Sequence, residues 1–344
     1  MTGPAGGNPP GLDLGRFGPW LRSNLAGVQG DLSARLVTGG KSNLTYEVTD
    51  GVTTWIVRRP PLGHVLATAH DMAREYRVMR ALAGTAVPVP ATHLICEDDS
   101  VIGAPFYVMA RVPGTPYRHA AELEPLGSER TRTIALRLMD TLAALHEVDP
   151  GPVGLADFGR AEGYLHRQLS RWHKQMASSQ TRELPAAERL YELAAAAIPA
   201  EQPGTIVHGD FRLDNVLFDD DDRPTAVLDW EMATLGDPLA DLSLMLMYGR
   251  VSTTEVAGEV SDVTLAAGYP DEDELVRRYA ESTGRDVSQL GFYLGLAAYK
   301  LAAILEGIHY RHIHGQTVGP GFDGLSERVD VLLDVGLAAI QEIS

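Results

Sequence analysis

Cysteine is almost absent from this chain of 344 residues. The single cysteine, Cys96, excludes an intrachain disulfide framework and any metal site built from several thiolates, and we expect it to be a small core residue. Basic residues are also scarce, with 29 Lys and Arg against 46 Asp and Glu, which gives a net charge of −17. A surface this acidic repels phosphate backbones, so we expect no nucleic-acid partner.

No long apolar run is present either. The most apolar stretch, residues 293–305, contains Lys300 and is expected to be too short to span a bilayer. The N-terminus lacks a basic region followed by an apolar core, so we expect no signal peptide. The sequence therefore predicts a cytoplasmic protein with no membrane association, and no feature of it indicates an obligate protein partner.

Charge is divided unequally along the chain. Residues 1–112 carry 10 basic and 9 acidic residues, a net of +1, which leaves 19 basic and 37 acidic residues, a net of −18, for the remainder. The change falls just before Pro113 and Gly114, two turn-forming residues. Since a domain spans roughly 100–200 residues, the length allows two lobes. We predict a first lobe over residues 31–112 and a second over residues 113–344.

Residues 1–30 are predicted to form a disordered tail and a short leading helix. Four Gly and three Pro occur in residues 1–11, a composition that is typical of disorder. Residues 14–25 have the pattern of a short helix, which Gly15, Gly18 and Pro19 weaken.

The first lobe has the short apolar runs of a β-sheet. Strands are predicted at residues 35–38, 44–49, 53–58 and 106–109, and residues 70–82 form an amphipathic helix. The second lobe is mainly helical. Helices are predicted at residues 130–146, 164–176, 186–197, 272–282, 290–312 and 325–343, and one β-hairpin at residues 215–218 and 225–229. The fold class is therefore α+β, with a small β-rich lobe and a larger, mainly helical one.

One ordered set of polar residues can carry chemistry. Asp210 and Asn215 lie on an irregular loop that leads into the hairpin, and Asp229 lies 14 residues beyond Asn215 at the end of the second strand. Because a hairpin brings its two ends together, the Asn215 amide oxygen and the Asp229 carboxylate can converge on one cation. These are hard ligands that suit Mg²⁺. Asp210 would then be free to orient or deprotonate an attacking hydroxyl.

This set, with His208 before Asp210, resembles the catalytic loop and metal-binding aspartate of the protein-kinase-like fold. Gly209 stands where protein kinases have arginine, a variant that is typical of aminoglycoside phosphotransferases and related small-molecule kinases. The resemblance covers about residues 31–340. It implies a bilobal fold, Asp210 and His208 as catalytic-loop residues, Asn215 and Asp229 as Mg²⁺ ligands, and transfer of the ATP γ-phosphate to a hydroxyl of a small molecule. GTP in place of ATP stays open.

The resemblance also implies a nucleotide site in the first lobe. Arg58 matches the strand position where the family has lysine, and Glu75 would be its acidic partner on the helix. Since strand side chains alternate, Ile56 shares a face with Arg58 and could cover adenine. Arginine keeps the charge but is not equivalent to lysine. Arg59 and Lys41 therefore stay open as alternative phosphate contacts.

The remaining nucleotide contacts are also implied by resemblance. Gly40 and Ser42 lie in the turn that would cover the phosphates, although two glycines in this turn are a weak signal. Met109 and Val112 lie on the last strand and hinge, where backbone groups could bind the adenine edge. Asp241 is expected to support the catalytic loop as a structural residue.

Other motifs have simpler interpretations. Residues 157–159 spell Asp-Phe-Gly but precede the catalytic loop, so we interpret them as a coincidence. The acidic turn at residues 219–222 is expected to be solvated. His309, His312 and His314 are expected at a helix C-terminus and not around a metal.

The acceptor remains open between two classes. An acidic second lobe would attract polycationic aminoglycosides, which would imply antibiotic resistance. Residues 39–43, 58–63, 157–165 and 300–307 instead resemble the branch whose domain is also fused to acyl-CoA dehydrogenases, which suggests a hydroxyacyl thioester or a similar metabolite. A hypothesis of a different class is a nucleotide-binding module without catalysis.

Overall fold

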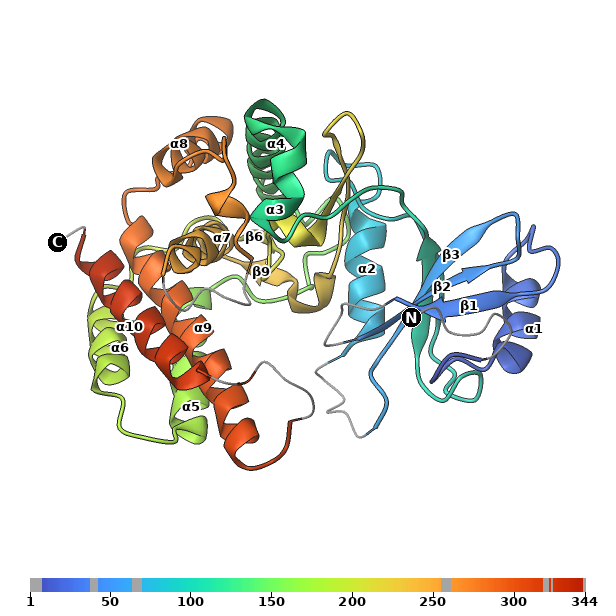
Figure 1. Ribbon diagram of the computed structural model, residues 1–344, viewed down its shortest axis with the longest axis horizontal. Coiled ribbons are helices and arrows are strands. Elements are labelled where there is room, and N and C mark those ends of the chain that lie inside the picture. The colour runs from blue at the N-terminus through green and yellow to red at the C-terminus, as the bar shows by residue number, and fades with distance from the viewer. Residues whose placement is uncertain are drawn as a thin grey trace. The chain divides into compact units, whose positions relative to one another are not determined.

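The computed structural model describes residues 8–37, 43–63, 70–254, 261–317, 322 and 324–342. Contacts divide the chain into two compact units (Figure 1). Unit 1 comprises Met1–Gly114 and Thr225–Glu231, and unit 2 comprises Thr115–Pro224 and Met232–Ser344. The segment Thr225–Glu231 belongs to unit 1 because Val227 N–H donates to the Pro88 carbonyl at 2.8 Å and Thr225 Oγ1 donates to the Pro113 carbonyl at 3.0 Å.

Unit 1 is built on one antiparallel five-stranded sheet with the strand order β1-β2-β3-β5-β4. Its strands are β1 (Ser33–Leu36), β2 (Leu44–Thr49), β3 (Thr54–Arg59), β4 (Thr92–Cys96) and β5 (Phe106–Ala110), and its helices are α1 (Leu14–Asn24) and α2 (Met72–Leu82). The β2–β3 hairpin forms because the Asp50 carboxylate accepts the N–H groups of Val52 and Thr53 at 2.9 and 2.7 Å.

The two faces of this sheet have different coverings. On one face Tyr46, Val48 and Val57 are buried in a core cluster with Phe17 and Leu21 of α1. The other face carries α2, which packs on β4 and β5. Alternation along β3 assigns its side chains to these two faces, and this decides which of them can serve a site.

The expectation of disorder for residues 1–11 is wrong for residues 8–11, while Met1 to Gly7 lie outside the described residues. Tyr46 Oη donates to the Pro10 carbonyl and Arg59 Nη1 to the Gly11 carbonyl, both at 2.6 Å. Leu12 is buried in the core cluster. Pro9, Pro10 and Gly11 therefore belong to an ordered segment, because the carbonyls of Pro10 and Gly11 have side-chain donors. The predicted leading helix is present as α1.

Unit 2 is mainly helical, as predicted. Its helices are α3 (Ala120–Leu123), α4 (Ser128–His146), α5 (Tyr164–Ser179), α6 (Pro185–Ala196), α7 (Leu239–Ser252), α8 (Glu272–Thr283), α9 (Leu290–Ile313) and α10 (Leu325–Gln341). Short strands β6 (Thr205–Val207) and β9 (Thr234–Gly236) pair antiparallel. Strand β7 (Val216–Phe218) of unit 2, a turn and β8 (Pro224–Val227), most of which belongs to unit 1, follow the predicted strand–turn–strand order. Single 3₁₀ turns are η1 (Glu124–Leu126), η2 (Leu213–Asn215), η3 (Trp230–Met232) and η4 (Val263–Leu265).

Helix α9 is the central helix of unit 2 and packs against α10, α5 and α7 (Figure 1). With 24 residues it is long and apolar enough to cross a membrane by length and composition, so the expectation that this stretch is too short is wrong. The apolar run extends beyond residues 293–305 in both directions as one continuous helix. Its most apolar window is 72% buried inside the protein, which is the environment of a core helix.

Candidate functional site

The loop that carries Asp210 follows β6 directly. His208 is completely buried, and Gly209 has a left-handed backbone with φ +86°. A Cβ at position 209 would lie 2.7 Å from Met232 Cβ and 2.8 Å from the Met232 carbonyl oxygen, closer than real Cβ contacts. Glycine is therefore required here both by conformation and by space.

Asp241, in the first turn of α7, holds the backbone of this loop. Its carboxylate accepts the N–H groups of His208 at 2.5 Å and Gly209 at 2.8 Å. Burial acts to raise the pKa of Asp241, but His146, His208 and the Gly209 N–H outweigh it and hold that pKa below its usual value. An ionised carboxylate thus holds two backbone N–H groups of the loop, and the expected structural role of Asp241 is confirmed.

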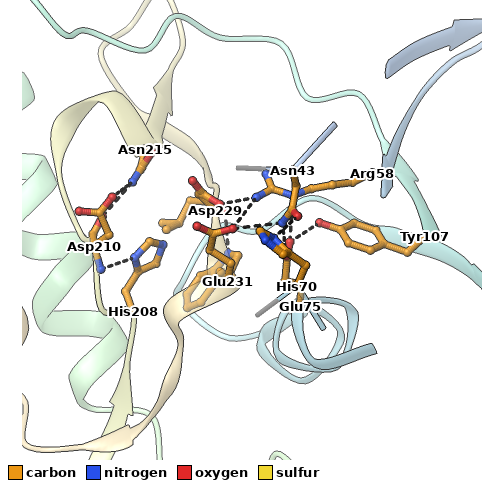
Figure 2. Close-up of polar contacts among 12 residues, drawn as sticks. Asn43, Arg58, His70, Glu75, Tyr107, His208, Asp210, Asn215, Asp229 and Glu231 are labelled. Atoms are coloured by element: carbon orange, nitrogen blue, oxygen red, sulfur yellow. Dashed lines mark hydrogen bonds and ion pairs between the residues drawn. The ribbon is translucent and has the colours of Figure 1, made fainter. Parts of the chain in front are cut away.

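The Asp210 side chain is held from several sides within unit 2. Tyr248 Oη donates to Asp210 Oδ1 at 3.1 Å, and Arg212 Nε lies 3.3 Å from Asp210 Oδ2. Asn215 Nδ2 donates to the Asp210 carbonyl at 2.8 Å and to Oδ2 at 3.2 Å, as Figure 2 shows. The Asp210 N–H donates to His208 Nδ1 at 3.3 Å, which places His208 as a brace of the loop. The structure thus brings His208, Asp210 and Asn215 together.

Three partners of this loop were not predicted as site residues. Tyr248 lies on α7, and burial followed by the charge of Asp210 raises its pKa. The Arg212 guanidinium stacks on the Tyr248 ring at 5.1 Å. Lys300 of α9 donates from Nζ to the Gly209 carbonyl at 2.8 Å. Arg212 lies inside the motif and could have been found there, but no local signal connects Tyr248 or Lys300 to a loop tens of residues away.

A second polar cluster lies in unit 1 on the α2 side of the sheet (Figure 2). Arg58 Nε lies 3.0 Å from Glu75 Oε2, so the ion pair expected between strand and helix is present. Arg58 Nη2 also pairs with Asp229 Oδ1. Tyr107 of β5, which is opposite Arg58 in the sheet register, donates from Oη to Glu75 Oε2 at 2.9 Å. The arginine and its acidic partners are therefore held as one network.

Burial shapes the charges in this cluster. Burial alone would lower the pKa of Arg58, but Tyr107, Glu75 and Asp229 outweigh it, so that pKa is raised and the guanidinium stays charged. Burial raises the pKa of Glu75 to about 7, against the lowering effects of Arg58 and Tyr107. Asn43 Nδ2 donates to Glu75 Oε1 at 2.8 Å and to Glu231 Oε2 at 3.1 Å.

Arg59 points to the opposite face of the sheet from Arg58. Its guanidinium is buried and donates to the carbonyls of Gly11 and Ile102 at 2.6 and 3.0 Å. The alternative that Arg59 contacts the phosphates is therefore wrong, because strand alternation directs it into the core of unit 1. Lys41, Gly40 and Ser42 lie outside the described residues.

The remaining predicted nucleotide residues share one region of unit 1. Ile56 and Met109 are register partners on β3 and β5. Each lies two residues along its strand from a member of the pair Arg58 and Tyr107. Register partners in a sheet point to the same face. Ile56 and Met109 thus lie on the face that carries Arg58, and Val112 follows β5. An apolar pair beside a cation fits the adenine and phosphate parts of a nucleotide.

The two predicted metal ligands belong to different units, Asn215 to unit 2 and Asp229 to unit 1. The Asn215 amide nitrogen is occupied by Asp210, which leaves its amide oxygen for a cation. Asp229 has φ +64°, a conformation that aspartate tolerates, and only its Oδ1 pairs with Arg58. Among the described residues, no group of three or more His, Cys, Asp or Glu could hold a metal. Amide and carboxylate oxygens are the kinds of donor that Mg²⁺ takes beside water and phosphate oxygens.

The Asp157-Phe158-Gly159 triplet has a packing role. Phe158 is buried, and a Cβ at Gly159 would lie 2.7 Å from the Leu235 backbone nitrogen. The glycine allows this segment to pack closely against β9. These contacts explain the triplet without a role in metal binding.

Comparisons with known proteins place these observations in a family. Residues 33–276 match the phosphotransferase enzyme family. The chain is 37% identical over 281 residues to acyl-CoA dehydrogenase family member 10 of Mus musculus, covering 80% of the chain and 26% of that relative. The chain thus spans about a quarter of that relative's length.

Solved structures share the fold. A crystal structure from Ralstonia eutropha JMP134, provisionally described as an aminoglycoside phosphotransferase, is 34% identical with a TM-score of 0.84, covering 96% of this chain and 99% of that one. A thermostable mutant of aminoglycoside phosphotransferase APH(4)-Ia, solved with AMP-PNP and hygromycin B, has a TM-score of 0.59 at 16% identity, covering 92% of this chain and 98% of that one. The α+β class and the protein-kinase-like fold are confirmed.

Proposed function

Since the chain belongs to the phosphotransferase enzyme family, we propose that it transfers the γ-phosphate of ATP to a hydroxyl group of a small molecule. The observation that carries this proposal is the fixed position of Asp210, whose carboxylate is held by Tyr248 and Asn215 while Asp241 holds its loop. Phosphoryl transfer depends mainly on positioning and charge neutralisation. A carboxylate immobilised in this way suits the orientation of an acceptor hydroxyl.

The proposed reaction needs only ATP and the acceptor as reactants. The acceptor oxygen forms a bond to the γ-phosphorus, while the bond from that phosphorus to the β,γ-bridging oxygen breaks and ADP leaves. Asp210 accepts the proton of the hydroxyl, and His208 keeps the Asp210 backbone in place. We assign Asn215 and Asp229 as ligands of Mg²⁺, which when bound would neutralise phosphate charge.

The nucleotide is proposed to bind on unit 1. Arg58 would contact the phosphates, and its ion pair with Glu75 would fix the direction of the guanidinium. Ile56 and Met109 would cover adenine, with backbone groups near Val112 at its polar edge. Gly40 and Ser42 stay predicted as part of the turn that covers the phosphates.

For the acceptor, we favour a hydroxylated metabolite over a polycation. Charge beside Asp210 does not separate the two classes, because the cations Arg212 and Lys300 lie among the carboxylates of Asp210, Asp214 and Asp241. The net charge of −18 on residues 113–344 acts over longer distances, where salt screens it beyond about 8 Å. Similarity to an acyl-CoA dehydrogenase family member supports a hydroxyacyl thioester.

Aminoglycosides remain the second candidate acceptor. The observation in their favour is the similarity, at 34% identity, to a chain provisionally described as an aminoglycoside phosphotransferase. The non-catalytic alternative is disfavoured because a nucleotide-binding module would have no need for Asp210 to be held by Tyr248 and Asn215.

The test is ADP formation from Mg²⁺-ATP or Mg²⁺-GTP with two acceptor panels, hydroxyacyl-CoA thioesters and aminoglycosides. We expect turnover with the thioesters and a fall in kcat of about 10²-fold or more in Asp210→Asn, which keeps the shape but cannot accept the proton. The exposed Asp220→Asn serves as the matched control. Nucleotide binding without turnover on either panel would favour the non-catalytic alternative, and full activity of Asp210→Asn would refute the role of Asp210.

A further inference from the structure

Lys300 is a charged residue in α9, the most apolar helix among the residues that the structure describes. The ten residues before it in α9, from Leu290 to Tyr299, are all buried, and Lys300 itself is partly buried. Shielding an ammonium from water is unfavourable unless it gains strong partners. Its position in α9 therefore needs an explanation that packing alone does not give.

The explanation lies in the peptide that joins Gly209 to Asp210. Lys300 Nζ donates to the Gly209 carbonyl of this peptide at 2.8 Å. The Asp210 N–H of the same peptide donates to His208 Nδ1 at 3.3 Å. Both polar groups of one peptide plane are thus fixed. The preceding two N–H groups bind Asp241. Together these bonds set the direction in which the Asp210 side chain leaves the backbone.

The surroundings of Lys300 keep its ammonium group at this carbonyl. Its Nζ lies 5.7 Å from the centre of the Trp172 ring, within the range of a cation–π contact. Burial lowers the pKa of Lys300, the carboxylates of Asp210 and Asp241 act to raise it, and Arg171 adds to the lowering. The ammonium group thus contacts both the Trp172 ring and the Gly209 carbonyl.

We propose that Lys300 is a positioning residue for Asp210, acting through the Gly209 carbonyl to hold the catalytic carboxylate in its reactive orientation. This inference rests on the proposed function for its kinetic consequence but not for its structural one. Lys300 touches neither nucleotide nor acceptor in this role. Its removal should therefore lower kcat and leave the KM for ATP unchanged.

Lys300→Met tests the role, because methionine has a similar length and suits an apolar helix but donates no hydrogen bond. We expect kcat to fall about 10- to 100-fold, the range for losing one charge-assisted hydrogen bond to the backbone. Lys300→Arg should recover part of this loss. Lys174→Met, at an exposed lysine of α5, is the matched control and should behave as wild type.

Two further measurements separate positioning from a merely structural role. Because the Gly209 carbonyl loses its donor, the Tm of Lys300→Met should fall by a few degrees, and Lys300→Arg, which keeps a donor, should restore Tm and kcat together. Kinetics are therefore measured well below the Tm of the variant, where it is folded. Hydrogen–deuterium exchange should quicken in the peptide covering residues 206–215 and stay unchanged in α10, whereas loss of a merely structural lysine would loosen both. Unchanged exchange in residues 206–215, or faster exchange in α10 as well, would overturn the proposal.

The exchange measurement also separates the two proposals. If wild type transfers phosphate to no acceptor but the loop still loosens in Lys300→Met, the proposed function fails and the positioning by Lys300 stands. If wild type is active and Lys300→Met keeps its kcat, its loop exchange and its Tm, the positioning fails and the proposed function stands.

Discussion

Arg58 has three carboxylates around it in unit 1, with Glu75 at 3.0 Å, Glu231 at 3.9 Å and Asp229 paired to Nη2 (Figure 2). One guanidinium cannot neutralise three ionised groups, and water is largely excluded from Glu75, which is 1% exposed. The cluster relieves this excess by raising the pKa of Glu75 to about 7 through burial. At neutral pH this residue therefore holds a proton for part of the time.

This shift predicts a pH dependence of stability. The pKa of Glu75 is about 7 in the folded protein against a usual value of 4.5, so between these values the folded state keeps the proton and the unfolded state releases it. The contribution of Glu75 to the free energy of unfolding is fully present below about pH 4.5. It is lost as the pH rises to 7, and above that pH it changes no further. Glu75→Gln cannot titrate, so its free energy of unfolding should gain on that of wild type by up to about 3 kcal/mol from pH 5 to pH 8.

Denaturant unfolding of both proteins at several pH values measures this difference. Glu192→Gln, at an exposed glutamate of α6, is the control, and its difference from wild type should stay constant with pH. A constant difference for Glu75→Gln as well, or one that moves the other way, would show that Arg58 keeps Glu75 ionised throughout.

Sequence predicted the residues of the site that are neighbours in the chain or follow a known spacing. His208, Asp210 and Asn215 come together because they lie within eight residues on one short loop. Glu75 of α2 pairs with Arg58 of β3. Lys300 was noticed only as an interruption of an apolar run. Its contact with Gly209 depends on how α9 packs, which no local pattern encodes.

At the scale of elements, β3 separates two adjacent arginines by function. Alternation puts Arg58 on the face of α2 and Arg59 in the core with Val57 and Trp55. The same charge on the same strand therefore has two different tasks. We propose Arg58 as the phosphate contact of unit 1, whereas Arg59 ties the segment at Gly11 to the sheet.

Substituting each arginine by methionine should separate these tasks. Arg58→Met should weaken the binding of Mg²⁺-ATP about tenfold or more, because the proposed phosphate contact is lost. Arg59→Met should bind as wild type but lose about 2–4 kcal/mol of stability, because two buried carbonyls, Gly11 and Ile102, lose their donor. Titration calorimetry and denaturant unfolding measure the two effects. Weak binding by a stable Arg59→Met would show that the phosphate contact has been assigned to the wrong arginine.

Most elements could be predicted, and the exceptions have physical reasons. Long amphipathic helices such as α4 and α5, and strands with clear alternation such as β2 and β3, carry strong local signals. Strand β4 was missed because its five residues have an irregular burial pattern and a register shift against β5 between Thr92 and Leu94. Tertiary pairing, not local sequence, defines it. The 3₁₀ turn η2 was missed as well, since it is only three residues long.

At the scale of the whole molecule, unit 1 combines residues from distant parts of the chain. Unit 1 takes in Thr225–Glu231, so Asp229 belongs to the same unit as Arg58 although they are 171 positions apart. Trp230, which is buried and donates to the Val227 carbonyl at 2.9 Å, anchors the bend that follows Asp229. A ligand that needs Asp229 and Arg58 therefore depends on the insertion of this segment into unit 1.

Binding of Mg²⁺-ATP should stabilise the molecule, and the effect should depend on Asp229. A ligand at a hundredfold excess over its Kd adds about 2.7 kcal/mol to the stability of the state that binds it. We expect Tm to rise by a few degrees with Mg²⁺-ATP, and to rise much less when EDTA removes the metal.

Asp229→Asn is the variant of choice because asparagine tolerates the φ of +64° at this position but brings no charge to a cation. It should lose most of the Mg²⁺-dependent shift, while Asp220→Asn, in an exposed turn, should keep it. An equal shift in Asp229→Asn would mean that the nucleotide binds without this carboxylate, and the absence of a shift with both ATP and GTP in wild type would contradict the nucleotide site itself.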